Sequence, residues 1–196
     1  MPPDHKEMGR IILPCSVAEY WGLFHQSGCR FGFDAYYTFR GYRKIVISQD
    51  WTDGITDPNL KNGWRPSQQW KQISYEVDVQ NNPFLKLTPT TKNYLIVEQE
   101  PHHMQLRLWT QLKGVPYCDS FNAEEQYAVV SLPRVGSPNL PSNKCAFRIS
   151  LRMVFHKKIP LFQGKIEKGS LDKGVESFSN WTNWALARLQ EHRSVP

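Results

Sequence analysis

The fold of this chain is decided near its C-terminal end, by the stretch LDKGVESFSNWTNWALARLQEHR at residues 171–193. At 100° per residue, apolar and small side chains fall on one side of a helix, with Trp181 and Leu186 at the two borders of the stripe. The stripe consists of Leu171, Val175, Phe178, Thr182, Ala185 and Leu189. Ser170 is placed to cap the start of this helix. The stretch therefore predicts an amphipathic helix that needs a broad apolar partner.

Glycines weaken the helical pattern before this point, at positions 164, 169 and 174. We therefore expect residues 161–169 to form a separate helical turn or a kinked extension of the main helix. No other stretch of the sequence has the pattern of a long helix. The partner of the apolar stripe must then be a β-sheet.

Alternating apolar residues supply that sheet in the middle of the chain. Strands are predicted at 10–15, 44–51, 69–80, 92–98, 104–113, 122–132 and 145–156. Loops are expected at 52–67, 81–91 and 133–143. Ser16 and Glu19 form a capping box for a first helix, and a second short helix is expected at 31–39. The pattern predicts an antiparallel α+β fold in which a curved sheet wraps the last helix and leaves an apolar cavity between them.

The composition of the chain fits one globular domain. Of its 196 residues, 40% are hydrophobic, which is enough to bury a core. We expect a flexible lead-in at 1–9, a single domain at 10–192 and a short tail at 193–196. The formal charge of +6 favours a negatively charged partner, and composition alone leaves nucleic acid and an anionic membrane surface open. No apolar run approaches the roughly 20 residues that cross a bilayer.

The sequence shows no motif that carries catalysis or holds a metal. Its four cysteines contain no CxxC pair, which favours free thiols in a reducing compartment. Adjacent histidines at 102–103 are interpreted as a solvated turn rather than a metal site. Two acid pairs, Glu98 with Glu100 and Glu124 with Glu125, are explained more simply as exposed carboxylates. Lysines and arginines are scattered, so we expect neither an enzyme nor a nucleic-acid-binding protein.

Several segments together resemble one known family. They are ISYEV at 73–77 leading into NPFLK at 82–86, VPYCDSF at 115–121, KIEKG at 165–169, and LPCS at 13–16. In their order and spacing they resemble the VASt domain, the StART-like lipid-transfer module of the Aster and Lam sterol transporters and of related plant and fungal proteins. The similarity covers most of the chain from Ile11 to Leu189.

The resemblance implies a helix-grip fold that holds a sterol, such as ergosterol or cholesterol, against the C-terminal helix without any cofactor. It also implies a lid at the cavity mouth made of Asn82, Pro83, Phe84, Leu85, Lys86 and Leu87. Full-length members of the family add a GRAM domain and a transmembrane helix. The chain is then expected to be an excised domain of a protein anchored at the endoplasmic reticulum, on the cytosolic face near membrane contact sites.

Alternation along the strands and the last helix suggests which residues line the cavity. The expected wall is Ile73, Tyr75, Leu95, Val97, Leu106, Leu108, Tyr127, Val129, Phe147, Ile149, Phe178, Trp181 and Ala185. The alternative for each residue is that it fills an ordinary core, and a face assigned by alternation can slip by one residue. A polar group such as Gln69, Gln126 or Tyr75 is expected to meet the sterol hydroxyl, directly or through water.

The expected function is non-vesicular transfer of one sterol between anionic membranes, by a monomer. Lys86, Lys165 and Lys168 are the expected contacts to lipid headgroups. One alternative is a lipid-sensing or scaffold module that binds lipid or a protein partner without net transfer. Another is an enzyme on the same scaffold, which a polar cluster inside the cavity would favour.

Overall fold

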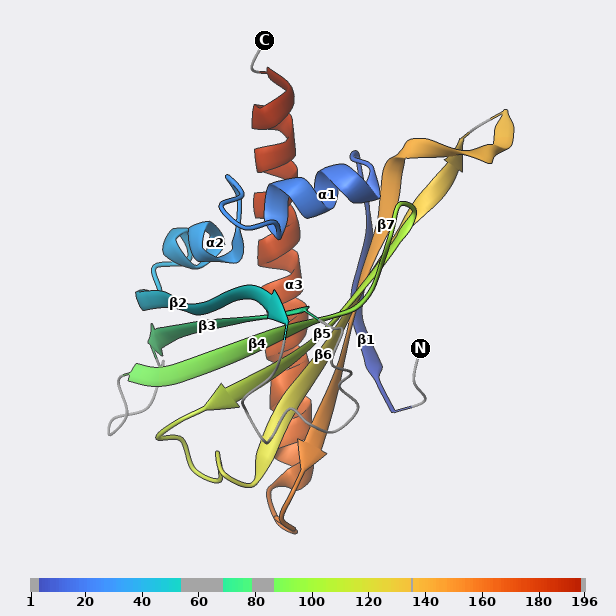
Figure 1. Ribbon diagram of the computed structural model, residues 1–196. Helices are drawn as coiled ribbons and strands as arrows, with labels where there is room; N and C mark the ends of the chain where they lie inside the picture. The colour runs from blue at the N-terminus through green and yellow to red at the C-terminus, as the bar shows by residue number, and fades with distance from the viewer. Residues whose placement is uncertain (1–3, 54–68, 79–86, 135, 195–196) are drawn as a thin grey trace.

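A computed structural model describes residues 4–53, 69–78, 87–134 and 136–194 of the chain. Within these ranges, seven strands form one antiparallel sheet in the order β1-β7-β6-β5-β4-β3-β2. The strands are β1 (Lys6–Leu13), β2 (Arg43–Asp53), β3 (Gln69–Asp78), β4 (Leu87–Glu100), β5 (His103–Leu112), β6 (Phe121–Arg134) and β7 (Ser137–Phe155). The long helix α3 (Gln163–Ser194) lies across the sheet (Figure 1).

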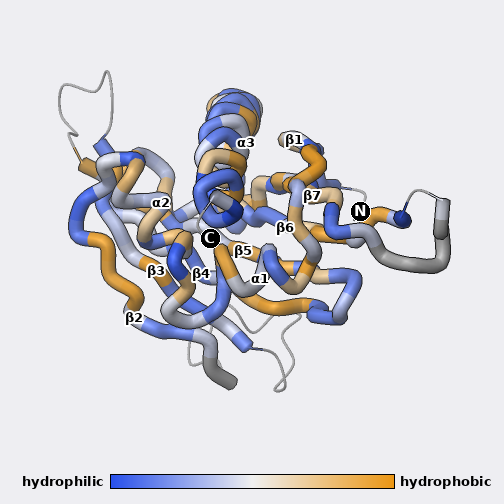
Figure 2. The backbone as a smooth tube through the Cα atoms, turned by 90° about the horizontal axis from the view of Figure 1, so that it is seen from above, coloured by the Kyte–Doolittle hydropathy of each residue, from blue (hydrophilic) through white to orange (hydrophobic). Residues whose placement is uncertain are grey.

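The sheet is a meander that curves around α3. Strands β2 to β7 pair with their neighbours in chain order, and β1 pairs with β7 at the other edge. Seen along the axis of α3, the sheet passes from β2 on one side of the helix to β1 on the other (Figure 2). Helices α1 (Val17–Phe24) and α2 (Phe33–Phe39) connect β1 to β2. The predicted helix-grip fold is confirmed.

The predicted capping box starts α1. The backbone N–H of Glu19 donates to the Ser16 hydroxyl at 3.2 Å, and the Ser16 N–H donates to the Glu19 carboxylate at 2.7 Å. Val17, Tyr20 and Phe24 are buried on the inner side of this short helix. The cap therefore fixes where the helix begins and which side chains reach the core.

Large aromatic side chains join the three helices to the sheet. The ring of Trp181 on α3 lies 4.6 Å from that of Phe147 on β7 and 5.7 Å from that of Phe24 on α1. Trp184 packs against Tyr36 of α2 at 5.3 Å. Because each such ring buries about 150–250 Å², this cluster is the main anchor of α3.

Helix α3 differs from its prediction in two ways. It is one continuous helix from Gln163, so the predicted start at Ser170 and the separate turn at 161–169 are wrong. The alternative expectation, an extension of the main helix, is what the structure has from Gln163 onward. A Cβ at Gly164 or Gly169 would meet no atom within 4 Å, and glycine in a helix costs only about 1 kcal/mol. Packing of the rest of the helix outweighs that cost. The second difference concerns the apolar stripe. Val175, which was predicted to belong to it, is 42% exposed, whereas Trp184, which was not, is buried.

Several strand boundaries also differ from the prediction. β1 begins at Lys6, inside the stretch expected to be a loose lead-in, because it pairs there with Leu151 of β7. β4 already begins at Leu87. The loop expected at 133–143 is instead the end of a long β6–β7 hairpin, where Pro133 pairs with Pro141 at a register shift. A proline that donates no hydrogen bond is tolerated at such an irregular end. Residues 54–68 and 79–86 lie outside the described ranges. They include most of the loops expected at 52–67 and 81–91 and the end of the strand expected at 69–80.

Candidate functional site

A pocket of about 230 Å³ lies between α3 and the concave face of the sheet. Its apolar lining comes from both layers and from α2, and includes Met8, Phe33, Ile149, Leu151, Phe178 and Trp181. These side chains share one wall because alternate residues of β1 and β7 face the helix, while residues 174, 178 and 181 follow one face of α3. The pocket therefore occupies the place where a helix-grip fold holds a ligand.

A charged pair lies inside this pocket. The Lys92 ammonium on β4 is 2.8 Å from the nearer carboxylate oxygen of Glu125 on β6, and the two side chains are only 11% and 13% exposed. Thr110 on β5 donates to the same carboxylate at 3.3 Å, and the Tyr127 hydroxyl donates to it at 3.1 Å. The sheet brings these groups together by pairing Lys92 with Thr110, and Leu108 with Glu125. The result is a polar cluster in an otherwise largely aromatic cavity.

Tyrosines supply further polar atoms of the site, beside Ser170, Lys173 and Ser177 of α3. Tyr36, Tyr37, Tyr42 and Tyr75 line the pocket, and the hydroxyl of Tyr37 lies 2.7 Å from that of Tyr94. Burial raises the pKa of Tyr37 well above its ordinary value, and burial followed by the charge of Tyr42 raises the pKa of Tyr75. The phenols of Tyr37 and Tyr75 stay protonated at neutral pH, so they can donate and accept hydrogen bonds.

The structure places the predicted cavity residues in three groups. Tyr75, Tyr127, Ile149, Phe178 and Trp181 lie at the pocket. Ile73, Leu106, Leu108, Val129, Phe147 and Ala185 are buried in the adjoining core on the α3 side of the sheet. The remaining four are Gln69, Leu95, Val97 and Gln126, and none of them lines the pocket.

The predicted face is wrong for Leu95, Val97 and Gln126. Leu95 packs against Trp70 and Trp109 on the convex face, in the same row as Arg107 and Gln126. Val97 is 39% exposed. The run from Tyr94 to Val97 is apolar throughout, so its alternation gives no direction, and Tyr94 and Ile96 face the core instead. Gln69 is exposed at the start of β3.

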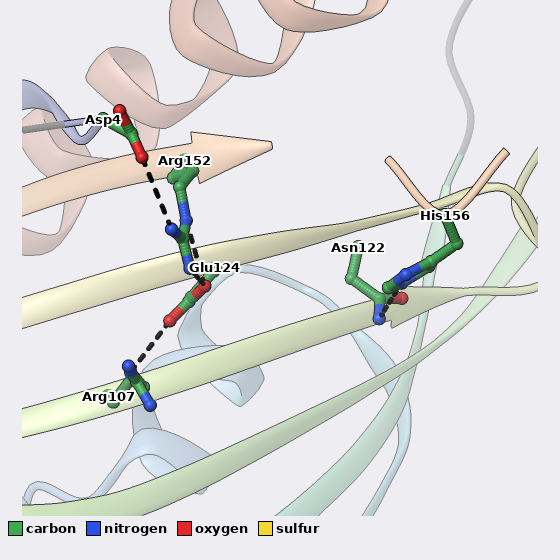
Figure 3. Close-up of polar contacts among 6 residues, drawn as sticks. All are labelled: Asp4, Arg107, Asn122, Glu124, Arg152 and His156. Atoms are coloured by element: carbon green, nitrogen blue, oxygen red, sulfur yellow. Dashed lines mark hydrogen bonds and ion pairs between the residues drawn. The ribbon is translucent and has the colours of Figure 1, made fainter. Parts of the chain in front are cut away.

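The two adjacent glutamates at 124–125 are neither exposed nor paired with each other. Being neighbours on β6, they point to opposite faces of the sheet. Glu124 is 3% exposed on the convex face, where Arg107 contacts it at 2.8 Å and Arg152 forms an ion pair with it (Figure 3). The expectation of exposed carboxylates is therefore wrong for this pair, and of the two only Glu125 belongs to the pocket. In the other pair, the side chain of Glu98 is 42% exposed and Glu100 is also exposed.

The other predicted site residues are placed only in part. Five lid residues, at 82–86, lie outside the described ranges and include Lys86, while Leu87 is the first residue of β4. Lys165 and Lys168 are exposed near the start of α3. His103 is the first residue of β5, directly after the β4–β5 turn, and its Nδ1 lies 3.0 Å from the Glu98 carboxylate. Within the described ranges, no three metal-binding side chains gather at one place.

The sequence matches the family model of the VASt domain, described as VAD1 Analog of StAR-related lipid transfer domain, over residues 7–173. The chain belongs to the VASt family. VASt is a family of lipid-binding domains and is not a known enzyme family. No curated protein matches the chain.

The VASt match ends before the helix does. It covers the sheet and the first part of α3, up to Lys173. The pocket residues Ser177, Phe178 and Trp181 lie beyond it, so the family match does not include the second half of the helix that covers the pocket. In the part of this VASt domain that the structure describes, no helix is both long and apolar enough to cross a bilayer.

Proposed function

We propose that this VASt domain binds one sterol in the pocket under α3 and exchanges it between membranes. The observation that carries the proposal is the pocket itself, a space between helix and sheet that is lined by apolar, aromatic and polar side chains and contains one buried charged pair. A sterol has a large apolar surface and one polar end. Burial of the apolar surface, at about 25 cal/mol per Å², offsets the loss of its contacts in the bilayer.

The size of the pocket indicates how binding proceeds. At about 230 Å³ it is smaller than the roughly 300–1,000 Å³ of pockets that enclose a drug-sized ligand. A sterol therefore requires side chains to move. Met8 is the most adaptable lining residue, because its unbranched chain has three rotatable bonds, and it lies against Gly174 of α3. We expect Met8 and its neighbour Phe178 to rearrange as the ligand enters.

The charged pair gives the ligand an orientation. An ammonium group has three hydrogens, and among the described residues the Lys92 ammonium contacts only the two oxygens of Glu125. A third hydrogen is then free for a hydroxyl or keto oxygen of the ligand. We therefore expect the polar end of the sterol to enter first, with Lys92 and Tyr75 as its partners.

A polar cluster in the cavity is also what an enzyme on this scaffold would need. Its geometry favours ligand anchoring, because the Glu125 carboxylate already accepts from Lys92, Thr110 and Tyr127. A carboxylate so occupied is poorly placed to take a proton from a substrate. The cluster thus supports binding, as the family assignment does.

The proposal is tested with a fluorescent sterol moved between donor and acceptor liposomes. Wild-type protein should bind and transfer it. Removing both charges together, as Lys92→Met with Glu125→Leu, avoids a lone buried charge and should be nearly neutral for stability. It should weaken cholesterol binding about tenfold, an energy typical of one hydrogen bond to a charged group. Binding of cholestene, which lacks the hydroxyl, should not change.

Three results separate this proposal from its rivals. Lys144→Met, an exposed lysine far from the pocket, is the matched control and should behave as wild type. Extraction of sterol without delivery to the acceptor would indicate a sensing or scaffold module. Failure to bind any sterol or phospholipid would reject the proposal, and mass spectrometry of co-purified lipid would identify the true ligand.

The proposed setting is the cytosolic face of the endoplasmic reticulum near contact sites, with the domain acting as a monomer on anionic membranes. The lid at 82–87 would guard the mouth, and Lys86, Lys165 and Lys168 would contact headgroups. Phe84→Asp should slow exchange while leaving the melting temperature nearly unchanged. An equal loss of fold would mean that this loop belongs to the core.

A further inference from the structure

Three large apolar side chains are exposed together where α3 begins. Leu161 is 83% exposed, Phe162 is 42% exposed and Tyr117 is 44% exposed. Leu161 and Phe162 belong to the β7–α3 connection, and Tyr117 belongs to the β5–β6 connection at the same end of the molecule (Figure 1). The rings of Tyr117 and Phe162 stack with centroids 5.4 Å apart. We call these three residues the wedge.

The wedge is held in place by contacts between its two connections. The backbone N–H of His156 donates to the Ser120 carbonyl at 2.8 Å, and the His156 ring lies 2.9 Å from the Asn122 amide (Figure 3). Tyr117 has φ of +63°, a left-handed conformation that is uncommon for a residue other than glycine. Such strain persists only where the surrounding structure holds it. The exposed rings are therefore preorganised rather than loose.

The surface around the wedge is basic. Lys113, Lys158, Lys165 and Lys168 are exposed and, among the described residues, have no ion-pair partner. Lys157 pairs with Asp119, whose pKa is lowered by that contact. Exposed apolar side chains with exposed lysines close to them along the chain match the surface of an anionic bilayer, with apolar chains below its negative headgroups.

We infer that the wedge is a membrane-docking surface that inserts Leu161 and Phe162 between the headgroups of an anionic bilayer, while the surrounding lysines contact the phosphates. Ser170, the first pocket residue of α3, follows Phe162 by about two helical turns, or about 12 Å along the axis. Docking by the wedge would thus bring the pocket next to the membrane. This inference goes beyond sterol exchange, because the domain would bind an anionic membrane through the wedge whether or not its pocket holds a sterol.

The first test is flotation of the protein with vesicles of phosphatidylcholine and phosphatidylserine, or of phosphatidylcholine alone. Wild type should float with the anionic vesicles, and Leu161→Asp should weaken that binding about tenfold, the effect of losing one buried leucine. Val46→Asp makes a comparable change at an exposed residue of β2, at the far edge of the sheet, and should leave binding unchanged. Both variants should keep the melting temperature of wild type, because both sites are solvent-exposed.

The second test addresses charge. Lys158→Glu should weaken binding to anionic vesicles at least about fivefold, whereas Lys144→Glu, at the opposite end of the sheet, should not. Added salt should weaken binding of wild type and reduce the difference between these two variants. Equal effects of the two reversals would mean that only net charge matters and would overturn the assignment of this surface.

The inference fails if wild type does not float with either vesicle, in which case the wedge contacts a protein or nothing. It also fails if Leu161→Asp floats as well as wild type. Sterol delivered from cyclodextrin without vesicles provides an independent readout, since Leu161→Asp should still bind it normally. Protein that floats with anionic vesicles but binds no sterol would support the docking surface and contradict the proposed function.

Discussion

His25 is a titratable residue enclosed by aromatic side chains. Its Nε2 lies 3.0 Å from the Tyr20 hydroxyl, and its ring stacks on Trp21 with centroids 5.8 Å apart. Burial, followed by the positive charge of Lys71, lowers the pKa of His25 to about 3. The folded protein therefore keeps this imidazole neutral at a pH where the unfolded chain protonates it.

The consequence is a loss of stability in mild acid. An unfolded histidine has a pKa of about 6.5. Above that value the contribution of His25 is complete, and the free energy of unfolding falls by about 1.4 kcal/mol per unit as the pH drops from there toward 3. We expect a loss of about 2 kcal/mol between pH 7.5 and pH 5, measured by urea denaturation.

His25→Phe is the matched variant, because it keeps a ring and cannot titrate. It should be less stable than wild type at pH 7.5, since Tyr20 loses a partner, but it should lose less stability on going to pH 5. Some dependence will remain, because burial also lowers the pKa of His5. Identical pH dependence in the two proteins would show that His25 is protonated without cost in the folded state.

Glu124 connects two arginines on the convex face. It is 3% exposed, and Arg107 and Arg152 approach its carboxylate from the neighbouring strands β5 and β7. Glu124→Gln would leave two cations facing each other, so we expect a loss of about 2–4 kcal/mol in the free energy of unfolding at pH 7. Glu7→Gln, which breaks an exposed pair with Arg10, should cost less than about 1 kcal/mol. Equal costs would mean that Glu124 is effectively solvated.

The charged residues of the pocket were not predicted as cavity residues from the sequence. Lys92 and Glu125 are charged, and a charged residue on an alternating strand is assigned to the solvent face by default. Their burial depends on the pairing of β4, β5 and β6, which brings opposite charges together. The sequence contained one indication of this contact. Lys92 and Glu125 have opposite charges, and a meander of hairpins places their strands two positions apart.

At the scale of elements, α3 and β1 meet through two glycines. A Cβ at Gly9 of β1 would lie 2.2 Å from the Phe178 ring, and a Cβ at Gly174 of α3 would lie 2.1 Å from the Met8 sulfur. Each glycine thus receives a large side chain from the opposite element. Phe178 and Gly174 are one helical turn apart, so the two contacts fix both the distance and the rotation of α3.

Gly9→Ala should therefore destabilise the fold by about 1–3 kcal/mol, because the Phe178 ring would have to leave its packed position to make room for the new methyl group. Phe178→Leu in the same chain should recover part of the loss. Gly169→Ala, where a Cβ meets open space, should instead stabilise the helix by about 0.5–1 kcal/mol. Thermal melting of the three proteins checks the order, and a neutral Gly9→Ala would show that the contact is loose.

Elements with a strong local signal were predicted well. The capping box at Ser16 and the β4–β5 hairpin follow from short-range patterns that the structure keeps. Boundaries that depend on distant pairing were missed. The polar start of β1 becomes a strand only because β7 lies beside it, and residues 163–169 stay helical because the rest of α3 is anchored by Trp181 and Trp184.

At the scale of the molecule, the two faces of the sheet carry different chemistry. The concave face and α3 enclose the pocket, whereas the convex face is joined across its strands by Glu124 and its arginines. The wedge lies at one end, where α3 begins. The sequence predicted the fold class because a long amphipathic helix after a series of antiparallel strands has few ways to bury its stripe. The position of the pocket under α3 depends on how the side chains pack. The spacing of apolar residues in the sequence carries no information on that packing.

Binding in the pocket should be visible in the stability of the whole molecule. A ligand that binds only the folded state stabilises it by about 2.7 kcal/mol at a free concentration of 100 Kd. For a chain of this size, each kcal/mol raises the melting temperature by about 2–4 °C, so cholesterol should raise it by about 5–11 °C. Lys92→Met with Glu125→Leu should show a smaller rise at the same concentration, because its affinity is lower. The rise should grow with the logarithm of ligand concentration. A melting temperature that stays constant while cholesterol is varied over two decades would mean that the folded state gains nothing from this sterol.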